Sequence, residues 1–225
     1  MAGTLYVVAT PIGNMDDISS RAKTVLASVG RIAAEDTRRT GLLLKRLGIK
    51  GDMVSYHEHN EAARTPQLLQ ALEGGMDLAL VTDAGTPAIS DPGYRLIKAA
   101  ADEGMTVSPV PGPSAVTAAL SVSGLPSDRF LFEGFLPRRK GRQTRLRSLA
   151  GFEGTVILFE SPLRLAATLR DVLEHFGNRR AVVGRELTKL HETLLRGTVQ
   201  ELLEAVETRA PKGECVLLVA KEGLS

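Results

Sequence analysis

Turn-forming and polar residues crowd together directly after an apolar run in the first half of the chain. Leu78–Val81 leads into the twelve residues Thr82–Gly93, which read TDAGTPAISDPG. The two glycines permit positive φ and close backbone approach, the two prolines fix φ near about −65°, and the hydroxyl and carboxyl side chains can bond to neighbouring amides. A plain connection needs fewer such residues. This segment therefore indicates a loop that holds backbone groups open to a ligand.

Three further loops in the first half follow apolar runs and carry unusual polar sequences. They are Thr10–Ser19, Glu35–Arg39 and His57–Glu61. In an open α/β sheet, ligands bind beyond the carboxyl ends of the strands. We therefore expect these loops to gather with Thr82–Gly93 along one edge.

The second half repeats the pattern in four short segments. These are Pro111–Ala115, Glu160–Arg164, Arg185–Lys189 and Lys212–Glu214. Each one alone is equally well explained by a helix cap or a structural ion pair. Their joint occurrence favours a binding site.

Several common chemistries lack their sequence signatures. Pro11–Asn14 does not complete a G-x-G-x-x-G dinucleotide fingerprint, no Walker A sequence occurs, and Ser90, Ser114 and Ser161 lack the G-x-S-x-G context of a serine hydrolase. The single cysteine, Cys215, rules out an intrachain disulfide and falls in a segment typical of a buried strand. The sequence argues against a nicotinamide enzyme, a P-loop NTPase and a serine hydrolase.

A metal site is the alternative use of the histidines. His57 and His59 stand two apart on what we expect to be an extended segment, so they would face the same way, with Glu58 and Glu61 nearby. The spacing matches none of the helical or finger signatures for zinc. We predict a hydrogen-bonding edge here and no metal.

A basic run marks the second half. Residues 1–111 carry 11 Lys and Arg against 13 Asp and Glu, whereas residues 112–225 carry 17 against 13. Six cations fall within ten residues that contain no acid: Arg138, Arg139, Lys140, Arg142, Arg145 and Arg147. A solvated helix face usually mixes signs, so the run predicts an anionic partner, with a merely solubilising role as the alternative.

The elements that must position these residues alternate between strand and helix. β-rich runs such as 4–9, 31–34, 53–57 and 78–81 are separated by helical patterns, which argues for βαβ units and a mostly parallel sheet in the first half. Prolines at 109, 111 and 113 mark a domain boundary. We predict two α/β domains, residues 1–111 and 112–225, with a cleft between them.

Composition fits a soluble globular protein of 225 residues, with 43% hydrophobic and 24% charged residues. No apolar stretch reaches the roughly 18 to 20 residues that span a bilayer. Met1–Thr4 runs into a strand pattern without a cationic leader region. We predict a cytoplasmic protein that does not associate with membranes.

Taken together, the motifs resemble the tetrapyrrole methylase superfamily of S-adenosylmethionine enzymes, a class III methyltransferase fold. Within it they are similar to the branch that methylates a cytidine ribose 2′-oxygen in small-subunit ribosomal RNA. The matching segments are Ala9–Asn14, Ala34–Arg38, His57–Glu61, Thr82–Gly93, Pro111–Ala115, Phe132–Pro137, Phe159–Pro162 and Arg185–Lys189. The wider superfamily commonly has Gly-Asp-Pro after the fourth strand, whereas Gly85-Thr86-Pro87 stands here, as in the RNA branch.

The resemblance implies that S-adenosylmethionine binds in the cleft between the domains. Carried over by position, its contacts are Pro11, Ala84, Gly85, Thr86, Ile89, Ser114, Ala115, Glu160, Gly213, Glu214 and Cys215, with others around Lys189. Residues of the Gly-Thr-Pro turn would present backbone donors and acceptors, and Ile89 with Ala115 would cover the adenine.

Methyl transfer to a ribose hydroxyl depends mainly on positioning, assisted by a general base or by a cation near the developing alkoxide. Our candidates are Glu35 and Asp36 as base or orienting carboxylates and Arg38 as their partner or a phosphate ligand. Lys189 with Glu186 would lie on the opposite side of the site. We expect Lys189→Ala to abolish turnover while cofactor affinity is kept.

The basic run fits an RNA partner, either naked small-subunit RNA or the assembled subunit, because Arg and Lys contacts to phosphate give affinity that falls with salt. With three Tyr, six Phe and no Trp, the sequence shows little sign of an aromatic stacking platform.

The resemblance also implies a homodimer. Two readings stay open: a tetrapyrrole C-methyltransferase of the same fold, and a non-catalytic RNA-binding module.

The chain departs from some relatives at Leu163, where they carry His, and at Thr193, where they carry Glu. Some members also continue into a C-terminal helical segment beyond the position of Ser225. We assign no function to Leu163 and Thr193.

Overall fold

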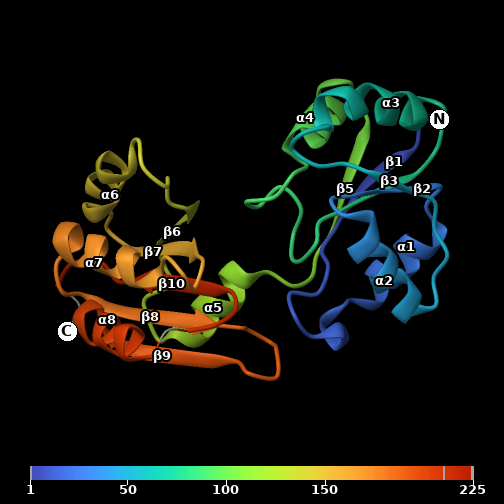
Figure 1. The fold of residues 1–225 in the computed structure, drawn as a ribbon. Helices are drawn as coiled ribbons and strands as arrows, with labels where there is room; N and C mark the ends of the chain where they lie inside the picture. Colours follow the sequence, from blue (N-terminus) through green and yellow to red (C-terminus); the bar gives the residue numbers. More distant parts are fainter. Residues whose placement is uncertain (1, 210, 224–225) are drawn as a thin grey trace. The chain divides into compact units, whose positions relative to one another are not determined.

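A computed structural model describes residues 2–209 and 211–223 (Figure 1). The chain divides into two compact units, Met1–Ser114 and Ala115–Ser225. The division falls three residues beyond Pro111, the boundary placed from the sequence, because Pro113 and Ser114 pack with the first unit. Thr86 donates its hydroxyl to the carbonyl of Pro113 at 3.3 Å.

The first unit is built on a five-stranded parallel sheet in the order β3-β2-β4-β1-β5. Its strands are β1 (Thr4–Val8), β2 (Arg31–Ala34), β3 (Met53–Ser55), β4 (Leu78–Val81) and β5 (Thr106–Val110). The central strand β4 is buried along its whole length, which explains its unbroken apolar sequence. The parallel sheet predicted for the first half is confirmed.

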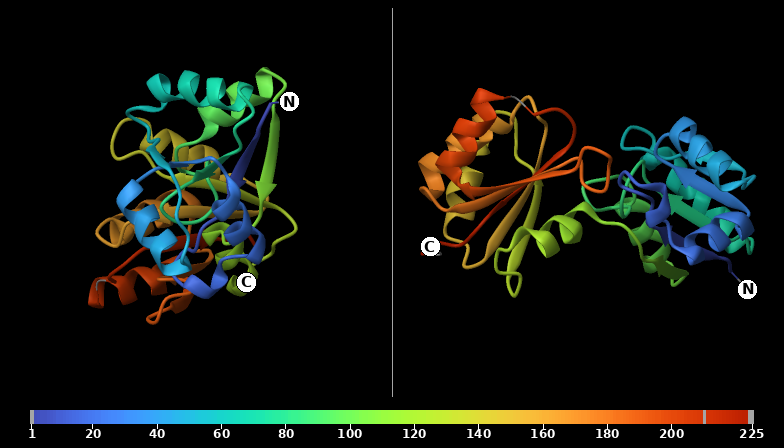
Figure 2. Two further views of the ribbon diagram at one scale, coloured as in Figure 1. Left: turned by 90° about the vertical axis from the view of Figure 1, so that its right-hand side faces the viewer. Right: turned by 90° about the horizontal axis from the view of Figure 1, so that it is seen from below.

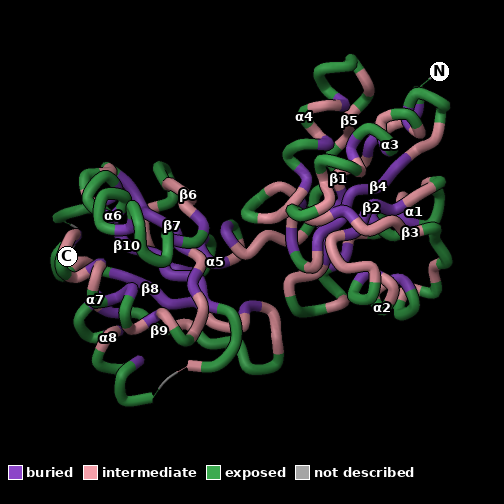
Figure 3. Tube along the Cα trace, turned by 45° about the horizontal axis from the view of Figure 1, so that its top comes forward, coloured by how far each residue is buried: buried purple, intermediate pink, exposed green. Residues whose placement is uncertain are grey.

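Helices cover both faces of this first sheet. They are α1 (Ser20–Ser28), α2 (Thr37–Leu47), α3 (Glu61–Glu73) and α4 (Tyr94–Asp102), and a 3-10 turn, η1, spans Met15–Asp17. Leu26 of α1 and Leu44 of α2 share one core, whereas Leu72 of α3 and Leu96 of α4 belong to the core on the other face. In Figure 3, β2 and β4 between these layers are mostly coloured as buried.

The second unit has a mixed sheet in the order β6-β7-β10-β8-β9. Its strands are β6 (Phe130–Phe135), β7 (Thr155–Glu160), β8 (Arg180–Arg185), β9 (Thr193–Thr198) and β10 (Cys215–Val219). Only β6 and β7 pair in parallel, because β10 runs antiparallel to both of its neighbours and β8 runs antiparallel to β9. Both units are therefore of the α/β class, but the first sheet is parallel and the second is mixed.

Three helices lie on one face of the second sheet and one on the other. The helices α6 (Arg142–Ala150), α7 (Leu165–Phe176) and α8 (Val199–Thr208) share a single core with the sheet, while α5 (Ala115–Ser123) packs on β10 and β8 from the opposite side. The right-hand view in Figure 2 shows this division of the second unit.

Sequence reasoning missed two elements of the second unit. β9 was not predicted, since Thr193–Thr198 contains two glycine-flanking polar residues and lies on an edge with an exposed pattern. The basic run was assigned no structure, yet its second half forms α6, whose buried side chains include Leu146 and Leu149. In both cases the apolar pattern is too sparse to identify the element.

None of the helices formed by the described residues is both long and apolar enough to cross a lipid bilayer.

Candidate functional site

The loops after β1 and β4 meet at the carboxyl edge of the first sheet. Thr10 and Gly85 form an antiparallel bridge, in which each backbone N–H donates to the carbonyl of the other at 2.9 and 3.0 Å. Helices after neighbouring strands leave toward opposite faces here, because α1 and α4 belong to different cores. In open α/β sheets this arrangement leaves room for a ligand.

The bridge changes the role predicted for Gly85. Its N–H and carbonyl are both bonded to Thr10, so they do not face a ligand as the sequence analysis proposed. Gly85 instead supplies a φ of 87°, which bends the loop so that Ala84 and Thr86 flank the bridge. The prediction that the Gly-Thr-Pro turn presents backbone groups is therefore wrong for Gly85 itself.

Backbone strain marks the rest of this loop. Ala88 and Ser90 are non-glycine residues with φ of 67° and 64°. Side chains disfavour this region, so neighbouring contacts must hold it, and such outliers cluster at ligand sites. Ile89 between them is 44% exposed, which is high for a large apolar side chain. The loop presents an apolar side chain at the sheet edge, as the predicted contact with adenine requires.

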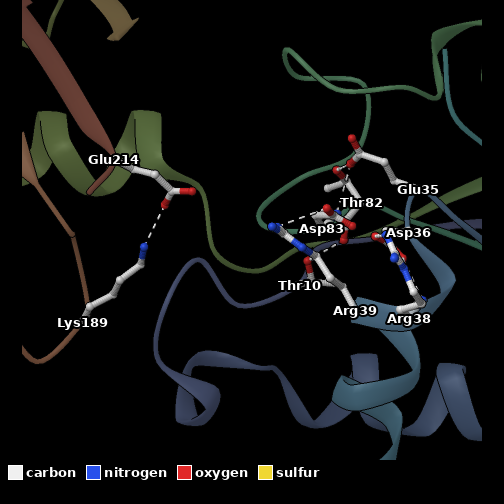
Figure 4. A network of polar contacts seen from close by, with 9 residues as sticks. All are labelled: Thr10, Glu35, Asp36, Arg38, Arg39, Thr82, Asp83, Lys189 and Glu214. Atoms are coloured by element: carbon white, nitrogen blue, oxygen red, sulfur yellow. Dashed lines mark hydrogen bonds and ion pairs between the residues drawn. The ribbon is translucent and has the colours of Figure 1, made fainter. Parts of the chain in front are cut away.

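Glu35, after β2, is tied to the loop after β4. One carboxylate oxygen, Oε2, accepts a hydrogen bond from the Thr82 hydroxyl at 2.6 Å and a second from the Asp83 amide at 3.2 Å (Figure 4). Thr82 is buried. Both hydrogen bonds go to Oε2. They orient the carboxylate, and Oε1 takes no part in either of them.

Two more carboxyl groups face Glu35. Burial, followed by repulsion from Glu35 and Asp83, raises the pKa of Asp91 to about 6. Burial and the charge of Glu35 also raise the pKa of Asp83, although an ion pair with Arg39 at 3.2 Å opposes that shift. Sequence reasoning did not select Asp91 as a functional residue, because its significance comes from neighbours that are distant in the chain.

Asp36 and Arg38 have a structural role that makes them poor catalytic groups. Asp36 caps α2 by accepting from the Arg38 amide at 2.8 Å, and its other oxygen binds the Arg38 guanidinium at 2.9 Å. The hydrogen bonds from Arg38 lower the pKa of Asp36 to about 2. Because a carboxylate so well stabilised is a weak proton acceptor, this geometry favours Asp36 as an orienting carboxylate, the other role we predicted for it, over Asp36 as a base. Arg38 is its partner, as one of our alternatives stated.

Residues of the second unit gather at one edge of their own sheet. Cys215 at the start of β10 pairs with Glu160 on one side and with Arg185 on the other. The loops Arg185–Lys189 and Lys212–Glu214 therefore lie next to each other. The register brings together four predicted contact residues: Glu160, Gly213, Glu214 and Cys215.

Lys189 is held between two carboxylates at this edge. Its ammonium group donates to Glu186 Oε1 and to Glu214 Oε2, both at 2.9 Å, and Figure 4 shows the contact with Glu214. Burial alone would lower the pKa of Lys189, but the hydrogen bonds that Lys189 donates to these carboxylates outweigh burial and raise the pKa. The same bond from Lys189, with the Glu214 amide, lowers the pKa of Glu186. Both shifts favour the charged forms of Lys189 and Glu186.

The turn that carries Glu186 is strained. Glu186 and Thr188 have φ of 51° and 65°. Gly213 has φ of 87°, which favours glycine, and a side chain there would displace the Glu186 carboxylate. Non-glycine residues with positive φ therefore occur at both edges, as Ala88 and Ser90 in the first unit and as Glu186 and Thr188 here.

The Glu160 side chain does not reach solvent. Its carboxylate is 0% exposed and accepts from the Ser161 amide at 2.8 Å and from the Thr168 hydroxyl at 2.6 Å. Any contact that Glu160 makes with a ligand must therefore use its backbone. Cys215 is likewise buried, and burial raises the pKa of its thiol to about 11, so it packs rather than reacts.

The basic run splits into buried and exposed parts. Arg142 is 8% exposed, and its guanidinium donates to Asp171 at 2.7 Å and to Thr168 at 2.9 Å. The prediction that Arg142 binds RNA is wrong, because its charge is already neutralised inside the fold. Arg145 forms an ion pair with Glu133. The other members, Arg138, Arg139, Lys140 and Arg147, are exposed.

His57 and His59 do not share an extended strand. β3 ends at Ser55, and residues 58–60 form a turn in which Asn60 Oδ1 accepts from the His57 amide at 2.9 Å. The expected extended segment is therefore wrong, but the two rings do lie side by side, with centroids 5.9 Å apart and an edge-to-face arrangement. Within residues 2–209 and 211–223, no group of three or more His, Cys, Asp or Glu side chains is placed to hold a metal ion.

A pocket of about 430 Å³ lies elsewhere in the second unit, between the end of α5, the start of β8 and the end of β9. Arg196 in its wall donates to the carbonyls of Val122 and Ser123 at 2.5 and 3.2 Å, which caps the C-terminal end of α5. This arginine stabilises the helix end, and we assign the pocket no part in the chemistry.

The fold and both edges define the class of protein. A family model for tetrapyrrole (corrin/porphyrin) methylases matches residues 4–203, and the chain belongs to that family. The predicted family and α/β fold class are thereby confirmed. Among similar chains, the "Ribosomal RNA small subunit methyltransferase I" of Mesorhizobium japonicum is 52% identical over 96% of this chain and 74% of its own length. The protein of the same name from Thermotoga maritima is 48% identical over 98% of this chain and 100% of its own.

Solved structures with low sequence identity share the fold. Diphthine synthase matches with a TM-score of 0.75 at 13% identity, covering 99% of this chain and 92% of its own. Cobalt precorrin-4 methyltransferase matches with a TM-score of 0.69 at 20% identity, covering 96% and 94%. At these identities the likeness establishes the fold alone.

Proposed function

We propose that the protein is an S-adenosylmethionine-dependent methyltransferase that methylates the 2′-oxygen of a cytidine ribose in small-subunit ribosomal RNA. The observation that carries the proposal is identity of about half of all residues, over nearly the whole chain, to proteins named for small-subunit ribosomal RNA methylation. Of the two structures cited above, only cobalt precorrin-4 methyltransferase is named for a tetrapyrrole reaction, and it is 20% identical.

The residues at the two edges suit a folded S-adenosylmethionine. Ile89 offers apolar cover beside the strained residues Ala88 and Ser90, and Ala84 and Thr86 flank the bridge at Gly85. Pro11 follows Thr10 of that bridge, and Ser114 and Ala115 come directly after Pro113, to which Thr86 is bonded. In the second unit, Gly213, Glu214 and the backbone at Glu160 and Cys215 would complete the contacts. The bound cofactor supplies an electrophilic methyl group on a sulfonium.

Glu35 is the best candidate for the general base. Its orientation is fixed by Thr82 and Asp83, whereas Asp36 is neutralised by Arg38. In the reaction the ribose 2′-oxygen bonds to the methyl carbon as the sulfur–carbon bond breaks, and the hydroxyl proton passes to the base. Lys189, fixed by Glu186 and Glu214, would stabilise negative charge that develops on the attacking oxygen.

We also propose an RNA-binding surface, a homodimer and a cytoplasmic location. Arg138, Arg139, Lys140 and Arg147 would contact RNA phosphates, either in naked RNA or in the assembled small subunit. A homodimer and a cytoplasmic location follow from the family resemblance and from the proposed substrate. Charge reversal at Arg138 and Arg139 would weaken RNA binding without changing cofactor affinity, and salt-independent binding would contradict the phosphate contacts.

The decisive experiment supplies S-adenosylmethionine with a labelled methyl group and offers three substrates: unmethylated small-subunit RNA, assembled small subunits and a porphyrinogen. We expect label in 2′-O-methylcytidine, identified by mass spectrometry after nuclease digestion. Label in the porphyrinogen would support the tetrapyrrole reading. RNA binding without any transfer would support a non-catalytic module.

A pair of variants in the first unit tests the cofactor contact. Ile89→Asp places a charge at the proposed adenine surface and should raise KM for S-adenosylmethionine about ten- to hundredfold, the value of one buried large apolar side chain. Leu42→Asp is the matched control, because Leu42 is 52% exposed on α2 and outside the site. Equal effects in both variants would remove Ile89 from the cofactor site.

A further inference from the structure

Most of the phenylalanines of this chain lie on one face of one strand pair. The sequence contains six, and four of them stand on β6 and β7: Phe130, Phe132, Phe135 and Phe159. The other two belong to the core beneath the helices, since Phe176 is buried there and Phe152 packs against it. The placement of the four on β6 and β7 therefore calls for a separate explanation.

A bulge puts the three phenylalanines of β6 on the same face. Leu131 packs against the helix-side core and Glu133 pairs with Arg145 of α6, so Phe130 and Phe132 point to the outer face. The register shifts between Phe132 and Gly134, where φ is 73°. Because of this extra residue, Phe135 also faces outward, although simple alternation would turn it toward the helices.

Ring contacts link β6 to β7 on this outer face. The Phe159 ring lies 4.8 Å from that of Phe132 and 5.7 Å from that of Phe135, both edge to face. Helix α5 covers β10 and β8 on this side, but β6 is the edge strand. Phe130 and Phe135 remain 43% and 56% exposed. The Phe135 ring is supported by Phe159 and is still more than half exposed, which is unusual for packing and suitable for stacking.

Unpaired cations follow at the same end of the strand. Arg138, Arg139 and Lys140 form the loop between Phe135 and α6, and all three are exposed (Figure 1). The ion pairs among the described residues use Arg142 and Arg145 from the basic run but not these three. An exposed aromatic surface beside exposed cations matches the two demands of unpaired RNA, whose bases stack on aromatic rings and whose phosphates bind Arg and Lys.

We propose that the outer face of β6, through Phe130 and Phe135, stacks against unpaired bases of RNA while Arg138, Arg139 and Lys140 bind the adjoining phosphates. The inference rests on the proposed function, and it corrects the expectation that the chain lacks a stacking platform. A second copy of the chain is the competing occupant. The exposed cations beside this face attract a polyanion, whereas a second copy of the chain brings the same cations and no opposite charge among them.

The test measures binding of a short single-stranded RNA to the full chain by fluorescence anisotropy, without S-adenosylmethionine. Phe135→Ala and Phe130→Ala should each weaken binding about 5- to 150-fold, the range for loss of one stacked base. Phe135→Leu keeps apolar area but removes the ring, so it should lose most of the same affinity, and Phe135→Trp should keep it. Leu163→Ala is the control, because Leu163 is 95% exposed after β7 and has no ring.

Sedimentation of the same variants separates the two occupants. Stacking predicts that Phe135→Ala changes RNA affinity and leaves the oligomeric state unchanged. Dissociation of an oligomer by Phe135→Ala, with tolerance of Phe135→Leu and unchanged RNA affinity, would overturn the proposal in favour of a protein interface. Because this binding assay involves no methyl transfer, its failure leaves the proposed reaction standing, and failure of the transfer assay leaves the stacking result standing.

Discussion

The carboxyl edge of the first sheet and the edge of the second sheet that contains Glu160 and Cys215 both carry acidic side chains, but in opposite electrostatic surroundings. In the first unit Glu35, Asp83 and Asp91 face one another, and the pKa of Asp91 rises to about 6. In the second unit Glu186 is bonded to Lys189, and its pKa falls. Environments that push titratable groups apart in this way separate proton transfer from charge stabilisation. We therefore propose that the first edge serves proton transfer and the second serves charge stabilisation.

The sharpest test of this assignment compares two neighbouring acids of the first unit. Glu35→Gln should lower kcat for RNA methylation about 10²- to 10⁴-fold, the usual contribution of a general base, with little change in cofactor affinity. Asp36→Asn keeps an N-cap and should lower kcat less than tenfold. Single-turnover rates with saturating cofactor measure both effects. Similar losses in the two variants would mean that Glu35 acts only as a structural residue.

Lys189 tests the second edge. Lys189→Ala leaves Glu186 and Glu214 without their shared cation, and we expect turnover to fall about 10²- to 10³-fold while the Kd for S-adenosylmethionine is kept. Lys189→Arg supplies charge and should restore part of the rate. A variant at Lys189 with normal turnover would remove this residue from the mechanism.

The next largest expected effect is on the stability of the second unit. It comes from a buried hydrogen-bond network behind the second edge. Arg142 donates to Asp171 and to Thr168, and Thr168 donates to Glu160. Arg142→Ala leaves Asp171 uncompensated and should reduce the free energy of unfolding of the second unit by about 3 to 5 kcal/mol. The exposed Arg138→Ala should change it by less than about 0.5 kcal/mol.

Hydrogen exchange by mass spectrometry can localise the effect of Arg142→Ala, because faster exchange should appear in β7 and α7. All three tyrosines, Tyr6, Tyr56 and Tyr94, lie in the first unit, so tyrosine fluorescence reports the other unit separately. Uniform weakening of both units, or none in β7, would contradict a local role for Arg142.

Sequence alone predicts the first unit better than the second, for a physical reason. A buried parallel strand such as Leu78–Val81 has an unmistakable apolar run, and its carboxyl end must adjoin those of its neighbours. The edge strand β9 has an exposed pattern that resembles a loop. The loops of the site could be located from their turn residues, but side-chain pairing could not. Arg142 and Arg138 look alike in a basic run, and only packing distinguishes them.

The smallest and most specific effect that we expect comes from Asp91. It is a pH-dependent change in the free energy of unfolding. Its pKa of about 6 in the folded protein lies above the usual value of 3.8. Between these values the folded state holds a proton that the unfolded chain releases, so the free energy of unfolding falls as pH rises from about 4 to 6. Asp91→Asn removes this cost and should stabilise the first unit by at most about 3 kcal/mol above pH 6.

Urea titrations followed by tyrosine fluorescence at pH 4, 6 and 8 measure the effect, since Asp91 and all the tyrosines share the first unit. The stabilisation by Asp91→Asn should be largest at pH 8 and nearly absent at pH 4. Asp102→Asn is the matched control, because Asp102 is exposed on α4 and paired with Lys98. If Asp91→Asn were neutral or destabilising at pH 8, neither burial nor repulsion by Glu35 and Asp83 would disfavour the charge of Asp91, and the contrast between the two edges would fail.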